Sequence, residues 1–61
     1  MNSKSLMIEL KSAGWKLIRV RGSHHIFRHS DLPQTVVVPH PRKDLPPGTV
    51  HAIRRHAGLV T

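Results

Sequence analysis

The chain of 61 residues carries ten lysine and arginine residues against three acidic ones, which gives a formal net charge of +7. It has no cysteine, which excludes disulfide bonds and thiolate metal sites and fits the reducing cytoplasm. No stretch approaches the roughly 18 apolar residues of a membrane span, and the N-terminus lacks the apolar core of a signal peptide. We therefore expect one small basic domain, residues 1–61, whose partner is a polyanion such as nucleic acid.

The first predicted element is a helix over residues 4–13. Its apolar side chains recur at the i, i+4 and i+7 positions of one helical face: Leu6, Leu10 and Ala13. Ser3 is expected to cap the start of this helix, and Gly14 is expected to end it.

A β-hairpin is expected after this helix. Residues 15–21 alternate in the manner of a strand, with Lys16, Ile18 and Val20 on one face and the residues between them on the other. The Gly-Ser pair at 22–23 forms the tight turn, because glycine tolerates the positive φ that such turns often need.

The second strand of this hairpin is predicted over residues 24–29. Phe27, the only phenylalanine of the chain, is expected to point into the core and to share its face with His25 and His29. The opposite face then carries His24, Ile26 and Arg28. The alternation therefore separates the two adjacent histidines and turns the first of them outward.

A third strand and a second helix complete the chain. β-Branched residues predict a strand over 35–39, and the next segment of about ten residues predicts a proline-rich loop of a length that often carries function. The last helix is expected to begin at Thr49 or one turn earlier, at Pro46 or Pro47. Its apolar positions are Val50, Ile53 and Ala57.

This order of elements predicts an α+β fold of the form α-β-β-β-α. Short sequential strands favour a three-stranded antiparallel sheet with both helices on one face. The other face of the sheet is then open to water or to a partner, and it is the face to which His24 is expected to point.

The residue types permit a metal-free reaction on RNA. The sequence has no plausible Ser-His-Asp set, no glycine-rich phosphate loop and no familiar zinc spacing among its six histidines. RNA supplies its own 2′-hydroxyl nucleophile, and a histidine such as His24 can transfer the proton. The arginines that can stabilise charge on the phosphate are Arg19, Arg21 and Arg28. The alternative for His24 is an ordinary amphipathic side chain at an edge of the sheet.

Two segments, GSHHIF at 22–27 and VVVPHPRKDLPPGTVHAIRRHAGL at 36–59, follow a helix that ends in AGW. In this combination, order and length, the chain resembles the HicA toxins of bacterial HicA–HicB toxin–antitoxin pairs. The resemblance implies a fold like that of a double-stranded-RNA-binding domain. It also implies a ribosome-independent mRNA endonuclease that arrests growth, and a cognate HicB-like antitoxin that masks its active site.

The resemblance places the essential histidine of the family at His24 and its motif glycine at Gly22. We therefore predict His24 as the catalytic residue, with no metal or other cofactor. The predicted RNA-binding residues are Gly22, Ser23, Arg21, Arg28, Arg42 and Lys43. For Arg42 and Lys43 the alternative to phosphate contact is a solvated run of charges.

Structural roles compete with functional ones at several further residues. We expect His25 and His29 to pack toward the core, whereas His40 either contacts RNA or stiffens its loop. Trp15 is expected to cover the edge of the core; stacking on a base is the alternative and requires an exposed ring. Ile26 on the open face is either a chance exposure or an antitoxin contact.

Two other functions use the same features. A non-catalytic RNA-binding module keeps the fold and the basic face but does not depend on His24. A structural adaptor uses its basic surface only to dock on an acidic protein, and a strongly salt-dependent affinity for RNA argues against it.

Overall fold

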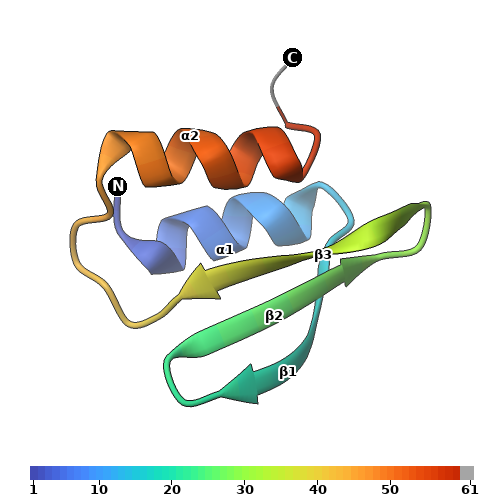
Figure 1. The fold of residues 1–61 in the computed structure, drawn as a ribbon, viewed down its shortest axis with the longest axis horizontal. Helices are drawn as coiled ribbons and strands as arrows, with labels where there is room; N and C mark the ends of the chain where they lie inside the picture. Colours follow the sequence, from blue (N-terminus) through green and yellow to red (C-terminus); the bar gives the residue numbers. More distant parts are fainter. Residues whose placement is uncertain (60–61) are drawn as a thin grey trace.

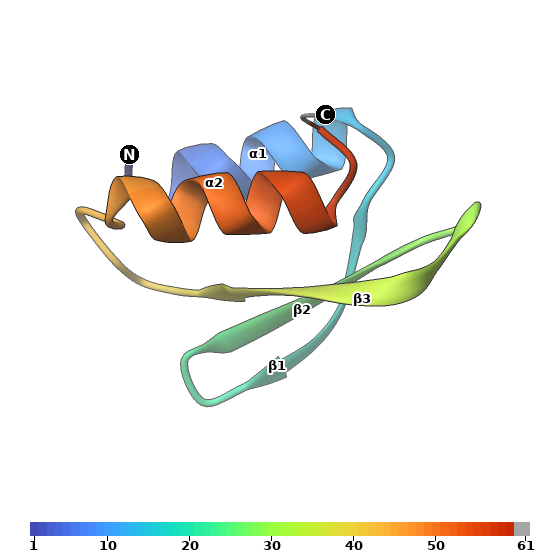
Figure 2. The ribbon, with the colours of Figure 1, turned by 45° about the horizontal axis from the view of Figure 1, so that its top comes forward.

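The computed structural model describes residues 1–59, which form a layer of two helices on a sheet (Figures 1 and 2). The elements are α1 (Ser3–Ser12), β1 (Lys16–Arg21), β2 (His24–His29), β3 (Leu32–Pro39) and α2 (Pro47–His56). The strands pair antiparallel in the order β1-β2-β3, and Figure 2 shows both helices on the same face of the sheet. The expected α+β fold is confirmed, although residues 60 and 61 of the expected domain lie outside the described residues.

The start of α1 differs from the prediction. Asn2, not Ser3, is the N-cap, and its side-chain oxygen accepts a hydrogen bond from the Ser5 amide at 2.7 Å. Asparagine and serine are both good caps, so local preference does not distinguish them. Ser3 instead belongs to the first turn and is 1% exposed, because its hydroxyl bonds to the loop before α2. Gly14, with a φ of 95°, ends the helix as expected.

A β-bulge interrupts β1 and overturns the predicted alternation. Leu17 pairs with Phe27, but the next paired residue is Arg19, so Ile18 has no partner. One extra residue in a strand sends every later side chain to the opposite face. Leu17 therefore lies on the side of the helices, whereas Arg19 and Arg21 lie on the other side.

Strand β3 is longer at its start than the β-branched run predicts. It begins at Leu32 and includes Pro33, so the turn from β2 is confined to residues 30–31. Proline is tolerated here because β3 is an edge strand, where an N–H is not needed on the outer side. The pairing of β2 with β3 shifts at a bulge: Arg28 pairs with Thr35, but the next residue, His29, pairs with Leu32.

The core lies between the helices and the sheet, and the side chain of Phe27 is completely buried in it. Its buried apolar residues are Leu6, Met7, Leu10, Trp15, Phe27, Val36, Val38, Leu45, Val50 and Ala57. The Nε1–H of Trp15 donates to the carbonyl of Ala57 at 3.3 Å, so the indole also holds the end of α2. The expected core role of Trp15 is confirmed, and a ring that is 2% exposed offers no surface for stacking on a base.

Helix α2 begins at Pro47, so the earlier of the expected starts is correct. Proline suits the first turn because it has no N–H to satisfy there, and Pro46 provides the cap position. The loop between β3 and α2 therefore spans only residues 40–46. Buried Leu45 anchors this loop, and its amide donates to the carbonyl of Met1 at 2.8 Å. Neither helix in residues 1–59 is long and apolar enough to cross a membrane.

An ion pair joins the two helices. The Nε and Nη2 groups of Arg54 donate to the two carboxylate oxygens of Glu9 at 2.8 and 3.0 Å. The hydrogen bond with Glu9, supported by the negative charge of that residue, raises the pKa of Arg54 against the opposing effect of desolvation. Arg54 is therefore a structural residue, while its neighbour Arg55 stays exposed.

Candidate functional site

Cross-strand pairing decides which side chains share the face of the sheet that the helices leave uncovered (Figure 2), here called the open face. Directly paired residues of antiparallel strands project to the same side. Phe27 and its partner Val36 are buried under the helices, so the pairs on either side of them point to the open face. The rows of the open face are Arg21–His24–Pro39, Arg19–Ile26–Val37 and Lys16–Arg28–Thr35.

His24 is exposed on the open face, at the end of β2 next to the Gly-Ser turn. Arg21 lies directly opposite His24, and Arg19 lies two positions back along β1 on the same face. Directly opposite Cβ atoms are about 4.5–5.5 Å apart, so a group bound at the imidazole is also within reach of the Arg21 guanidinium. Simple alternation from Leu17 would have sent both arginines to the helix side; the bulge at Ile18 brings them to His24.

The open face is strongly cationic. Its four cations are Lys16, Arg19, Arg21 and Arg28, and among residues 1–59 no acidic side chain belongs to its rows. Arg28 lies further from His24 than Arg21 does, because the row of Ile26 separates them. A surface of one sign concentrates a polyanion and orients its approach, independently of base sequence.

The turn beside His24 leaves space for a close approach to its own backbone. Gly22 has a φ of 56°, which confirms the expected positive φ, and nothing lies within 4 Å of the position where a Cβ would be. The carbonyl of Ser23 accepts a hydrogen bond from the His40 amide at 2.7 Å, so the turn is fixed to the end of β3.

The other two histidines of β2 face the helices, as the alternation predicts. His29 accepts at Nδ1 from the Asp31 amide at 3.0 Å and contacts the Ala13 carbonyl through Nε2 at 3.1 Å, which gives it a structural role. His25 is half-buried, and its Nδ1 atom is buried without a hydrogen-bond partner among the described residues. Within residues 1–59 no three histidine, cysteine or acidic side chains gather closely enough to hold a metal ion.

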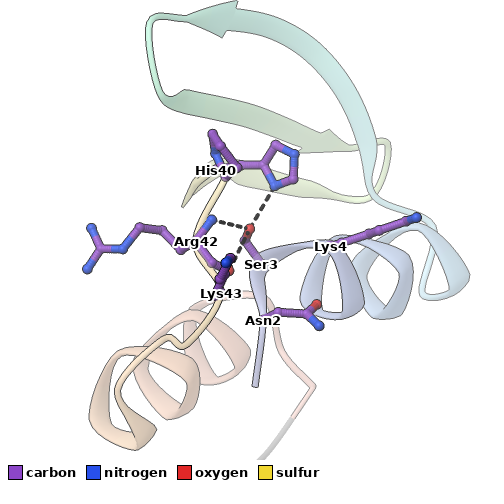
Figure 3. Close-up of a pocket in the computed structure, with 7 residues that line it drawn as sticks. Asn2, Ser3, Lys4, His40, Arg42 and Lys43 are labelled. Atoms are coloured by element: carbon purple, nitrogen blue, oxygen red, sulfur yellow. Dashed lines mark hydrogen bonds between the residues drawn. The ribbon is translucent and has the colours of Figure 1, made fainter.

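A second group of polar residues lies where the loop after β3 meets the start of α1 (Figure 3). The Ser3 hydroxyl lies 2.7 Å from His40 Nδ1 and accepts a hydrogen bond from the Arg42 amide at 2.9 Å. The ring of His40 also meets the ring of His25 edge to face, with centroids 4.7 Å apart. Beside these contacts lies a pocket of about 320 Å³ whose lining includes Ser3, Lys4, His40, Pro41, Arg42 and Lys43.

The structure therefore divides the predicted RNA-binding residues into two groups. Arg21 and Arg28 share the open face with His24, and Gly22 and Ser23 form the adjoining turn. Arg42 and Lys43 instead line the pocket beside Ser3, on the helix side of the sheet. Sequence reasoning missed Ser3 and Lys4 as members of this second group, because the Ser3–His40 contact joins residues 37 positions apart and leaves no local signal.

Residues 3–59 match the family described as the HicA toxin of bacterial toxin–antitoxin systems. A solved structure described as a HicA3 and HicB3 toxin–antitoxin complex matches with a TM-score of 0.78 and 26% identity, covering 95% of this chain and 94% of that one. No curated sequence matches. The family match extends from the first turn of α1 past the end of α2, and so the chain belongs to the HicA toxin family.

Proposed function

We propose that this chain is the toxin of a toxin–antitoxin pair and acts in the cytoplasm as a ribosome-independent mRNA endonuclease. The observation that carries the proposal is the placement of His24, exposed on a cationic sheet face with Arg21 directly opposite it. His24 is the catalytic residue of this proposal. The open face and the glycine turn hold the RNA backbone through phosphate contacts.

The proposed reaction uses only groups of the RNA and of the protein. The 2′-oxygen attacks the adjacent phosphorus and forms a new O–P bond, while the bond from phosphorus to the 5′-oxygen of the next nucleotide breaks. The 2′-hydroxyl loses its proton to a base, and the leaving oxygen takes up a proton. Histidine performs such transfers near neutral pH, and Arg21 stabilises the charge that develops on the phosphate. The products are a 2′,3′-cyclic phosphate and a 5′-hydroxyl end.

A HicB-like antitoxin is the proposed protein partner, and it masks His24 when bound. The matching solved structure is itself a complex of a toxin with an antitoxin. The open face also carries the apolar side chains of Ile26 and Val37 between its cations, and Val37 is 43% exposed. Such a mixture of apolar and charged surface suits a protein partner as well as RNA.

The test is cleavage of end-labelled single-stranded RNA by the purified protein in EDTA. The wild type is expected to cut, and His24→Ala is expected to cut at least about 100-fold more slowly, as is typical for loss of a general acid or base. His51→Ala removes an exposed histidine of α2 and serves as the matched control, with cleavage like that of the wild type.

Three outcomes would overturn the proposal or one of its parts. RNA binding without cleavage by the wild type identifies a non-catalytic binding module instead. Fragments with 5′-phosphate and 3′-hydroxyl ends exclude attack by the 2′-hydroxyl. Cleavage that His24→Ala leaves unchanged assigns the catalytic role to another residue.

A further inference from the structure

The pocket beside Ser3 combines the two kinds of surface that bind single-stranded nucleic acid. Three cations contribute to its lining, Lys4, Arg42 and Lys43, and no acidic residue does. His40 and Pro41 supply an aromatic ring and an apolar ring next to these charges. Proteins that bind single strands pair a cationic groove for the backbone with flat side chains on which a base packs. A volume of about 320 Å³ is at the lower end of the range for small-ligand sites.

The ring of His40 is held in place before any ligand binds. Ser3 is 1% exposed, and its hydroxyl has one proton to donate. The hydroxyl lies 2.7 Å from His40 Nδ1 and 3.3 Å from the Arg42 carbonyl, so it ties the ring to the start of α1 and to the loop. The edge-to-face contact with His25 restrains the other side of the ring.

The pocket lies at the same end of the sheet as His24. Pro39 is the strand partner of His24, and the amide of His40, the next residue, bonds to the Ser23 carbonyl at 2.7 Å. Successive residues of a strand point to opposite faces, so the two histidines lie on opposite sides of this end of the sheet. A single strand that passes round the Gly-Ser turn therefore reaches both His24 and the pocket.

We propose that the pocket is a nucleotide subsite for single-stranded RNA. Arg42 and Lys43 bind a phosphate next to the one at His24, and the base or sugar packs on the fixed rings of His40 and Pro41. Lys4 extends to the opposite side of the pocket from Arg42 and adds positive charge there (Figure 3). This inference rests on the proposed function for the identity of the ligand. It adds a specific second contact, on the helix side of the sheet, that orients the strand across the open face.

The experiment measures binding of a fluorescent 2′-O-methyl RNA tetranucleotide, which lacks the 2′-hydroxyl nucleophile, over a range of salt concentrations. The variant Arg42→Gln with Lys43→Gln is expected to weaken binding and to lower the slope of log affinity against log salt by up to about 0.7, which is the contribution of one phosphate contact to a single strand. The matched control, Lys11→Gln with Arg55→Gln, removes the same two charge types from exposed positions of the helices and should leave the slope unchanged.

A second arm separates packing from charge. His40→Ala is expected to bind the probe on the order of tenfold more weakly, as for loss of a stacking contact, without changing the salt slope. Thermal unfolding of each variant shows whether it is folded. If His40→Ala is unstable, the salt slope of the Arg42 and Lys43 variant still tests whether the pocket binds a phosphate.

Equal losses of affinity in the pocket variant and in the control variant would show a net-charge effect and would overturn the subsite. Unchanged RNA binding, together with weaker binding of the antitoxin, would identify the pocket as an antitoxin contact instead. Because the probe cannot be cleaved, the result is independent of catalysis. A wild type that fails to cut unmodified RNA would therefore refute the proposed nuclease while leaving the binding result readable.

Discussion

His24 and His25 are adjacent in sequence but have different surroundings. The pleat of β2 turns the first to the cationic open face and the second toward the helices, where its ring meets that of His40. The buried Nδ1 of His25 has no hydrogen-bond partner among the described residues, which is a modest cost in stability. Periodicity alone predicted this separation correctly, because Phe27 fixes which face of β2 is buried.

Gly22 is the residue whose backbone most directly supports the site. Its φ of 56° lies in the left-handed region, which costs a residue with a Cβ about 1–2 kcal/mol. We expect Gly22→Ala to lower the free energy of unfolding by about that amount and to reduce RNA cleavage, because relief of the strain moves the turn beside His24. Urea unfolding and the cleavage assay measure the two effects.

Gly48→Ala is the control for this substitution. Gly48 lies in the first turn of α2, without a left-handed φ, and nothing lies within 4 Å of its added Cβ. Alanine there should raise stability, by up to about 1 kcal/mol, and leave cleavage unchanged. A Gly22→Ala protein as stable and active as the wild type would show that the turn does not need glycine.

Among the elements, β1 contributes most to the site through its bulge. The unpaired Ile18 is what allows Leu17 to face the helices while Arg21 faces away from them beside His24. The bulge comes from the pairing of two strands and has no signature in the alternation of β1 itself. This is why the sequence predicted a strand here but placed Leu17 on the same face as Arg19 and Arg21.

Two single-residue deletions test this account. Deletion of Ile18 removes the bulge but keeps every observed pair, so we expect the protein to fold and to cleave RNA. Deletion of Val20 also removes the extra residue, but it places Ile18 opposite Ile26 and Arg19 opposite His25, so Arg19 leaves the open face while Arg21 stays opposite His24, and cleavage should fall. Circular dichroism confirms folding, and the labelled-RNA assay measures cleavage. Equal activity in the two deletions would contradict a role for the placement of Arg19 on the open face.

The order and approximate bounds of the elements could be predicted from local patterns in the sequence. The second group of polar residues, around Ser3 and His40, could not. The stripes of both helices and the burial of Phe27 each depend on residues a few positions apart, which a sequence displays directly. The contact between Ser3 and His40 depends on how the loop 40–46 folds back on α1. The sequence therefore predicted Ser3 as a helix cap, whereas in the structure its hydroxyl contacts His40 and Arg42, which line the pocket.

The protein as a whole has little stability to spare. A chain of about 60 residues buries only about 60% of its unfolded surface, and here no disulfide compensates. Phe27 is completely buried, and replacement of a buried phenylalanine by alanine costs about 3–5 kcal/mol. That loss is comparable to the entire stability of many small domains.

We therefore expect Phe27→Ala to be largely unfolded at 37 °C by circular dichroism and Phe27→Leu to be folded with a lower Tm. A partner that binds only the folded state stabilises it by mass action, so adding the antitoxin should restore part of the lost structure. A cooperative transition for Phe27→Ala at the wild-type temperature would show that the core does not depend on this ring.

The cations of β1 have a second consequence, for self-association. β1 is an edge of the sheet, with unpaired backbone groups and the exposed apolar side chains of Ile18 and Val20. Such an edge is a template for pairing with the same strand of another molecule, and charged side chains along it prevent this by repulsion. Arg19 and Arg21 therefore oppose the pairing of β1 with a second copy of the chain, in addition to the RNA contact that we propose for the open face. An inactive toxin for structural work is therefore better obtained by substituting His24 than by neutralising these arginines, because an uncharged β1 could pair with β1 of another molecule.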